Sequence, residues 1–106
     1  SIQGIQAGLY APNPEIPVMS YKEYQQYLIE ALAELDTFSE EAINALKGKS
    51  LILRVGGREM PFIAENFIQS LSLPNLHFHA TTAYNLLRRE GVPIGKMNYL
   101  GNLQTA

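Results

Sequence analysis

PNLHFHATTAYNLLRREGVPIGKMNYLG, residues 74–101, is the stretch that decides the fold, because it joins a proline start, a helix-length run and a glycine stop. Proline is tolerated in the first turn of a helix, and Gly91 stands where a left-handed residue commonly ends one. We therefore predict a helix from about Asn75 to Glu90, with two arginines in the last turn, where the helix dipole favours cations. The residues after it contain one Pro and two Gly and are predicted to fold back as an ordered loop, anchored by four apolar side chains, Val92, Ile94, Tyr99 and Leu100.

The chain before this stretch alternates between helical and extended patterns. Ser20 is followed three residues later by Glu23, which is the pattern of a capping box, so a helix with one broad apolar face is predicted to begin at the next residue. A further short helical turn is predicted within residues 39–47. The Gly56-Gly57 pair between two apolar, extended runs predicts a two-residue hairpin turn. Helical spacing resumes in residues 64–72, and the proline that follows predicts a kink or a new helix.

Composition excludes several classes of function. The chain has 106 residues, of which 46% are hydrophobic and 17% are charged, so a folded globular domain is expected. The net charge is −2 and the basic residues are scattered, which argues against binding to nucleic acid or to an anionic membrane. There is no cysteine, which excludes disulfides and thiolate chemistry. No apolar run approaches the roughly 20 residues of a membrane span, so we expect a soluble, cytoplasmic protein.

Five polar side chains of the predicted last helix are candidate binding residues. Thr81, Tyr84 and Arg88 follow His77 at spacings of four, three and four residues, which places all four on one flank of a helix. His79 lies on the other flank, about 160° from His77, so both rings of a regular helix cannot bind one ion. In an irregular start to the helix the two histidines would share a face, and His77 and His79 could then be metal ligands together.

Three interpretations of the histidines remain open. As ligands of a divalent metal they would need a third donor from elsewhere, and the HxxxH pattern is absent. As a general acid or base, His77 has partners in Thr81 and Tyr84, but no carboxylate is placed to orient its ring. In the third interpretation both histidines are structural and bond to backbone or hydroxyl groups at the start of the helix.

The string PNxxFHxTTAYxxLRxxGVxxGKxxYLG, which residues 74–101 contain, resembles the C-terminal signature of an uncharacterised bacterial and fungal family. That family is a domain of unknown function grouped with the DinB/YfiT-like candidate metalloenzymes. The resemblance covers about residues 16–101 and implies a mainly α fold, a DinB/YfiT-like helical bundle, here with three to four helices and a small β-hairpin insert. Such relatives bind metal through a histidine of an early helix and two more on later helices, and neither that helix nor the HxxxH pair has a counterpart here.

The resemblance also implies that residues 1–106 are a single domain, the C-terminal part of a longer four-helix-bundle domain whose N-terminal helices are missing. A bundle without two helices exposes a large apolar face, and such faces mark partner surfaces. We therefore expect either a missing N-terminal segment or a homo-oligomer, such as a dimer, to complete it. The function predicted is a small-molecule or metal site beside the last helix, and the alternative is a non-catalytic dimeric binding bundle with structural histidines. Whether the protein is an enzyme stays open.

Overall fold

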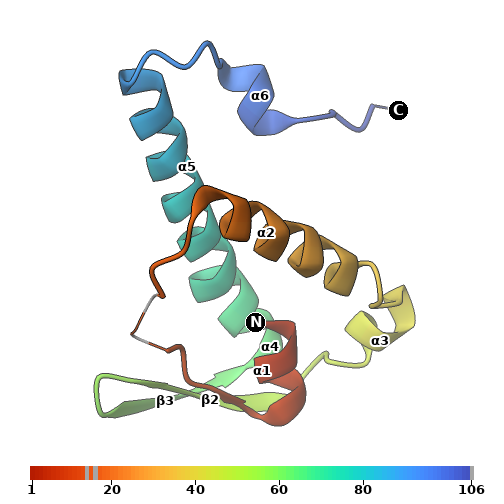
Figure 1. Ribbon diagram of the computed structural model, residues 1–106. Coiled ribbons are helices and arrows are strands. Elements are labelled where there is room, and N and C mark those ends of the chain that lie inside the picture. Colours follow the sequence, from red (N-terminus) through yellow and green to blue (C-terminus); the bar gives the residue numbers. More distant parts are fainter. Residues whose placement is uncertain (14, 16, 106) are drawn as a thin grey trace. The chain divides into compact units, whose positions relative to one another are not determined.

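The computed structural model describes residues 1–13, 15 and 17–105 (Figure 1). The chain divides into two compact units, Ser1–Phe67 and Ile68–Ala106. The first unit holds a small sheet with short helices and one long helix. The second unit holds the other long helix and the segment that carries the candidate site. Among the described residues, no helix has both the length and the apolar character that crossing a membrane requires.

The sheet of the first unit is built on a hairpin of β2 (Ser50–Val55) and β3 (Arg58–Ile63). The strands are antiparallel, and their register pairs Ser50 with Ile63 and Val55 with Arg58. The predicted two-residue turn is present, because Gly56 and Gly57 both adopt positive φ angles, 56° and 76°. Positive φ at both central residues is the geometry that matches the right-handed twist of the flanking strands.

A third strand, which the sequence did not reveal, extends this hairpin. Helix α1 (Ile2–Ala7) ends at Gly8, whose φ of 73° turns the chain in the left-handed region. Strand β1 (Leu9–Tyr10) follows at once and pairs parallel with β2, Leu9 opposite Ile52. The sheet within the described residues therefore has the order β1-β2-β3 and is mixed. Residues 2–10 thus form a short helix followed by an edge strand.

The core of the first unit lies where this sheet meets α1 and α4 (Ala64–Phe67). Phe67 is completely buried, and the rings of Tyr10 and Phe62 meet it edge-on at centroid distances of 5.3 and 5.7 Å. Edge-to-face pairs of this kind add to the free energy gained by burial. The buried apolar side chains of this core are Ile5, Leu46, Leu51, Leu53, Ala64 and Phe67.

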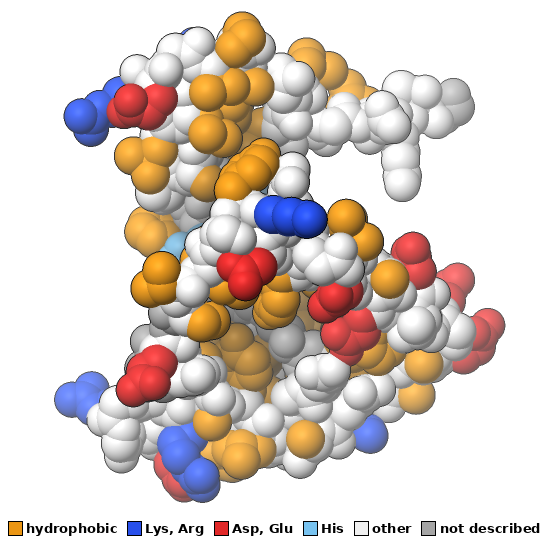
Figure 2. Space-filling view, in the orientation of Figure 1, with side chains coloured by type: hydrophobic (Ala, Val, Ile, Leu, Met, Phe, Trp, Pro, Cys, Tyr) orange, Lys and Arg blue, Asp and Glu red, His pale blue; other side chains and the backbone are white. Residues whose placement is uncertain are grey.

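Helix α2 (Tyr21–Leu35) begins at the predicted capping box. The Ser20 amide donates to the Glu23 carboxylate at 2.6 Å, and the Glu23 amide donates to the Ser20 hydroxyl at 3.4 Å. A shorter helix, α3 (Glu40–Asn44), follows. All residues of α2 are described and none of them is buried, so the apolar face of this helix is exposed. Figure 2 shows hydrophobic and acidic side chains together over α2 and α3.

The second unit begins with a π-helical turn, η1 (Ile68–Ser72), which leads directly into α5 (Leu73–Arg89). Pro74 stands in the first turn of α5, and the π-helical turn directly before it takes the place of the predicted kink. The helix ends before Gly91, which has a φ of 85°. The predicted loop beyond it contains a further short helix, α6 (Lys96–Leu100).

The prediction of a DinB/YfiT-like helical bundle is wrong. Within the described part of the chain, α2 and α5 have 15 and 17 residues, and the other helical segments have four to six. The buried side chains of the first unit come largely from β2 and from α4 beside it, and not from the faces of long helices. The physical reason is the left-handed turn at Gly8, which sends the chain into a parallel strand and makes the hairpin part of a three-stranded sheet.

Candidate binding groove between α5 and α6

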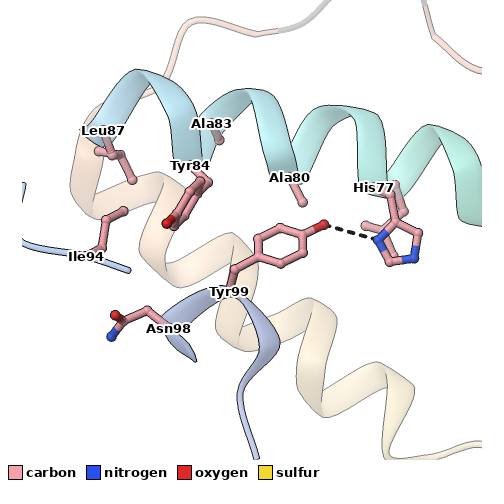
Figure 3. Close-up of a pocket in the computed structure, with 9 residues that line it drawn as sticks. His77, Ala80, Ala83, Tyr84, Leu87, Ile94, Asn98 and Tyr99 are labelled. Carbon is pink, nitrogen blue, oxygen red and sulfur yellow. Dashed lines mark hydrogen bonds between the residues drawn. The ribbon is translucent and has the colours of Figure 1, made fainter. Parts of the chain in front are cut away.

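The second unit contains an open groove of about 510 Å³ between α5, the segment after it and α6 (Figure 3). Binding sites for small molecules commonly have volumes of roughly 300–1,000 Å³ and apolar walls with a few polar groups. This groove has that composition. The nine described residues that line it are Leu76, His77, Ala80, Ala83, Tyr84, Leu87, Ile94, Asn98 and Tyr99.

The floor of the groove is the apolar face of α5. Leu76, Ala80, Ala83 and Leu87 follow one another at spacings of four, three and four residues, so they lie along one side of the helix. This face is not buried, since Leu76 and Leu87 are 60% and 49% exposed. The two alanines leave room for a ring from α6 to lie close to the backbone of α5, and that ring is Tyr99 (Figure 3).

Tyr99 connects α6 to two polar side chains of α5. Its hydroxyl oxygen lies 3.1 Å from His77 Nδ1 and 3.2 Å from Thr81 Oγ1, which donates to it. Because the Tyr99 oxygen accepts from Thr81, its own hydrogen can bond to His77 Nδ1, and the proton of a neutral His77 ring is then on Nε2. The Tyr99 ring also packs edge-on against Tyr84 at a centroid distance of 5.8 Å.

Tyr84 and Arg88, one turn apart near the end of α5, form a second polar group. Arg88 Nη1 donates to the Tyr84 hydroxyl at 3.4 Å, and the guanidinium carbon lies 5.7 Å from the centroid of the Tyr84 ring. On the α6 side, the Gly95 amide donates to Asn98 Oδ1 at 2.8 Å and so caps α6. The chain also returns toward α5 here, since the Val92 amide donates to the Leu87 carbonyl at 3.1 Å.

Four of the five predicted site residues take part in this arrangement. His77 and Tyr84 line the groove, Thr81 reaches it through the Tyr99 hydroxyl, and Arg88 reaches its edge through the Tyr84 hydroxyl. His79 is not among the described lining residues, and its ring instead packs edge-on against Phe78 at 5.2 Å. The neighbouring Thr82 bonds the carbonyl one turn back, Phe78 O, at 2.7 Å.

Two polar residues of the groove were not predicted as site residues. Tyr99 was expected only as an apolar anchor of the returning loop, and Asn98 was not singled out. One sequence signal could have indicated them. Asn98 follows Gly95 by three residues, and this spacing is typical of a capped helix start, so it predicts a helix that also carries Tyr99.

The described residues do not fit the divalent metal that the sequence suggested. His77 and His79 project from different sides of a regular helix, and Nδ1 of His77 is in contact with Tyr99. Over residues 1–13, 15 and 17–105, no three side chains of His, Cys, Asp or Glu are close enough together to hold an ion. We therefore assign no chemical step to a metal.

The shifted pKa values lie outside the groove, in the first unit. The Gly48 amide donates to both oxygens of Glu65, at 3.1 and 3.0 Å, and this bond lowers the pKa of that carboxyl group. Hydrogen bonds from Ser20 lower the pKa of Glu23 in the same way. A carboxylate that accepts backbone N–H groups is stabilised in its charged form. These two groups therefore serve capping and turn structure.

Comparison with known proteins identifies a family but no characterised relative. Residues 6–100 match the family of a domain of unknown function, DUF1993. Neither a curated protein nor a solved structure matches the chain.

Proposed function

The chain belongs to the family of the domain of unknown function DUF1993, and we propose that its role is to bind a small molecule in the groove between α5 and α6. The observation that carries the proposal is the pair of contacts from the Tyr99 hydroxyl to His77 and Thr81. They hold a polar side chain against an otherwise apolar hollow. An apolar site with a few placed polar groups is the usual composition of a ligand pocket.

The polar groups suit binding better than catalysis. When His77 Nδ1 accepts from the Tyr99 hydroxyl, Nε2 of the neutral ring carries the hydrogen and can donate to a ligand. A histidine that acts as a general base is usually oriented by a carboxylate, and the nine described lining residues include none. A catalytic role for His77, the relation to DinB/YfiT-like proteins and a cytoplasmic location are kept as predictions from the sequence.

Fragment screening by two-dimensional NMR tests the proposal. Fragments should shift amide signals of residues 76–100, and the Ala83→Leu variant should weaken these shifts, because its larger side chain fills the floor of the groove. The matched control is Ala31→Leu on α2, in the other unit. If fragments shift only signals outside the groove, or if both variants respond like the wild type, the groove is not a binding site.

A second candidate function, self-association into a dimer, is favoured by the exposed apolar face of α2. Tyr24, Leu28 and Leu32 stand at spacings of four residues and are 42%, 61% and 63% exposed. A contiguous apolar face of this kind is typical of partner surfaces. Light scattering should then report a dimer at micromolar concentration, and Leu28→Glu should shift it toward monomer while Gln26→Glu should not. A monomer throughout the concentration range would refute this candidate.

A further inference from the structure

We propose that the groove selects an amphipathic monoanion, a molecule with an apolar body and one carboxylate-like head group at the edge where Arg88 bonds to Tyr84. Asn98 lines the same groove. This inference rests on the proposed function, because it names the class of ligand for the same groove. It follows from the hydrogen-bonding capacity of that edge, from the charges of the second unit and from the shape of the floor.

Tyr84, Arg88 and Asn98 each have hydrogen-bond donors to offer. The Tyr84 oxygen accepts from Arg88, so its hydroxyl hydrogen is available to a bound molecule. Asn98 uses Oδ1 to accept from the Gly95 amide, which leaves its NH₂ group as a donor. Arg88 uses one nitrogen toward Tyr84, and a guanidinium has five N–H donors in a planar fork. A group of donors is complementary to a head group that only accepts hydrogen bonds, and a carboxylate is such a group.

The charges of the second unit favour the same choice. Residues 68–106 contain three basic side chains, Arg88, Arg89 and Lys96, and a single acidic one, Glu90. That acid lies beside Arg89, with Nε and Oε1 3.8 Å apart. Neither of the two ion pairs found among the described residues includes Arg88. The nine described residues that line the groove include no carboxylate for a cationic ligand, whereas an anionic one beside Tyr84 would lie near Arg88.

The floor of the groove provides for the apolar body. Leu76, Ala80, Ala83 and Leu87 run along α5 for about three turns, and Ile94 faces them from the returning segment (Figure 3). Arg88 follows Leu87 directly at the end of this row. A single-chain molecule with its head at Arg88 would place its apolar body against Leu87 and Ile94, beside the Tyr99 ring that lies over the two alanines. A head group without an apolar body would gain little from this floor.

Three molecules with the same ten-carbon chain separate the contributions of head and tail: decanoate, decanol and decylammonium. Binding is measured by NMR titration of amides 76–100, at ligand concentrations below micelle formation. The proteins are the wild type, Arg88→Gln and the matched control Arg89→Gln, which changes the adjacent arginine. Both arginines are exposed, so the variants are expected to fold, and circular dichroism checks this.

Decanoate should bind the wild type and Arg89→Gln alike, and Arg88→Gln about tenfold more weakly, as loss of a charge-assisted bond predicts. Decanol should bind more weakly than decanoate and be indifferent to Arg88→Gln. If decanol or decylammonium binds as tightly as decanoate, or if the two arginine variants behave alike, the anion preference is refuted while the groove remains a binding site. If no molecule of the series shifts these amides, the inferred ligand class is refuted, and the fragment screen then decides whether the groove binds any small molecule.

Discussion

Tyr99→Phe is the substitution that tests the arrangement of the groove most directly. It removes one oxygen atom and keeps the ring, so the edge-on contact with Tyr84 is preserved while the bonds to His77 and Thr81 are lost. Each hydrogen bond is expected to stabilise the contact between α5 and α6 by about 0.5 kcal/mol, the lower end of the usual range. The reason is that Tyr99 is 36% exposed, so water can bond to His77 and Thr81 when the hydroxyl is absent. The two bonds together give about 1 kcal/mol, which is about a fivefold change in an opening equilibrium.

The assay is amide hydrogen exchange measured by NMR at α6. The Asn98 and Gly101 amides donate within this helix, to the carbonyls of Gly95 and Met97, and they report its opening. Both should exchange about fivefold faster in Tyr99→Phe if α6 opens more readily when the bonds to α5 are lost. Exchange in β2 and β3, which belong to the first unit, should not change.

A matched control and a double variant sharpen the test. Tyr27→Phe, at an exposed position of α2, should leave exchange in α6 unchanged. Thr81→Val should have about half the effect of Tyr99→Phe, since it removes one of the two bonds. The double variant should exchange no faster than Tyr99→Phe alone, because the Thr81 bond is already absent in it. Additive effects, or α6 amides that exchange at the wild-type rate in Tyr99→Phe, would refute the inferred role of Tyr99.

Three further predictions concern the first unit. Phe67→Ala should lower the free energy of unfolding by about 3–5 kcal/mol, because Phe67 is completely buried; urea denaturation measures this, and a loss below about 1 kcal/mol would contradict the described core. Gly57→Ala should cost about 1–2 kcal/mol because its φ is 76°; thermal unfolding measures this, and an unchanged melting temperature would refute it. The bond from Gly48 lowers the folded-state pKa of Glu65, so its stabilising contribution is present above the ordinary pKa of 4.5 and is lost as pH falls through the lowered value. Stability measured against pH should therefore fall less steeply below 4.5 in Glu65→Gln, and an unchanged profile would count against it.

Elements that depend on neighbouring residues could be predicted from the sequence. The capping box of α2, the Gly56-Gly57 turn and the stop at Gly91 each involve groups at most a few residues apart, and all three are present. The common flank of His77, Thr81, Tyr84 and Arg88 also follows from helical spacing, once α5 is a helix.

Elements that depend on distant partners could not be predicted in this way. Strand β1 has two residues and is a strand only because β2, more than 40 residues later, supplies its hydrogen bonds. A two-residue run carries no periodicity that a pattern could reveal. The expected helical bundle failed for this reason, since the strand changes which faces are buried in the first unit.

For the candidate groove, the sequence by itself determined the polar flank of α5, because the positions around a helix depend only on the spacing of its residues. Tertiary structure alone decided that the Tyr99 hydroxyl meets His77 and Thr81, 22 and 18 residues away in the chain. It also decided that the Tyr99 ring packs edge-on against Tyr84, at a centroid distance of 5.8 Å. The physical reason is that such contacts depend on how the chain turns at Gly91 and restarts at Gly95, and the backbone angles there place α6 beside one face of α5 and not another.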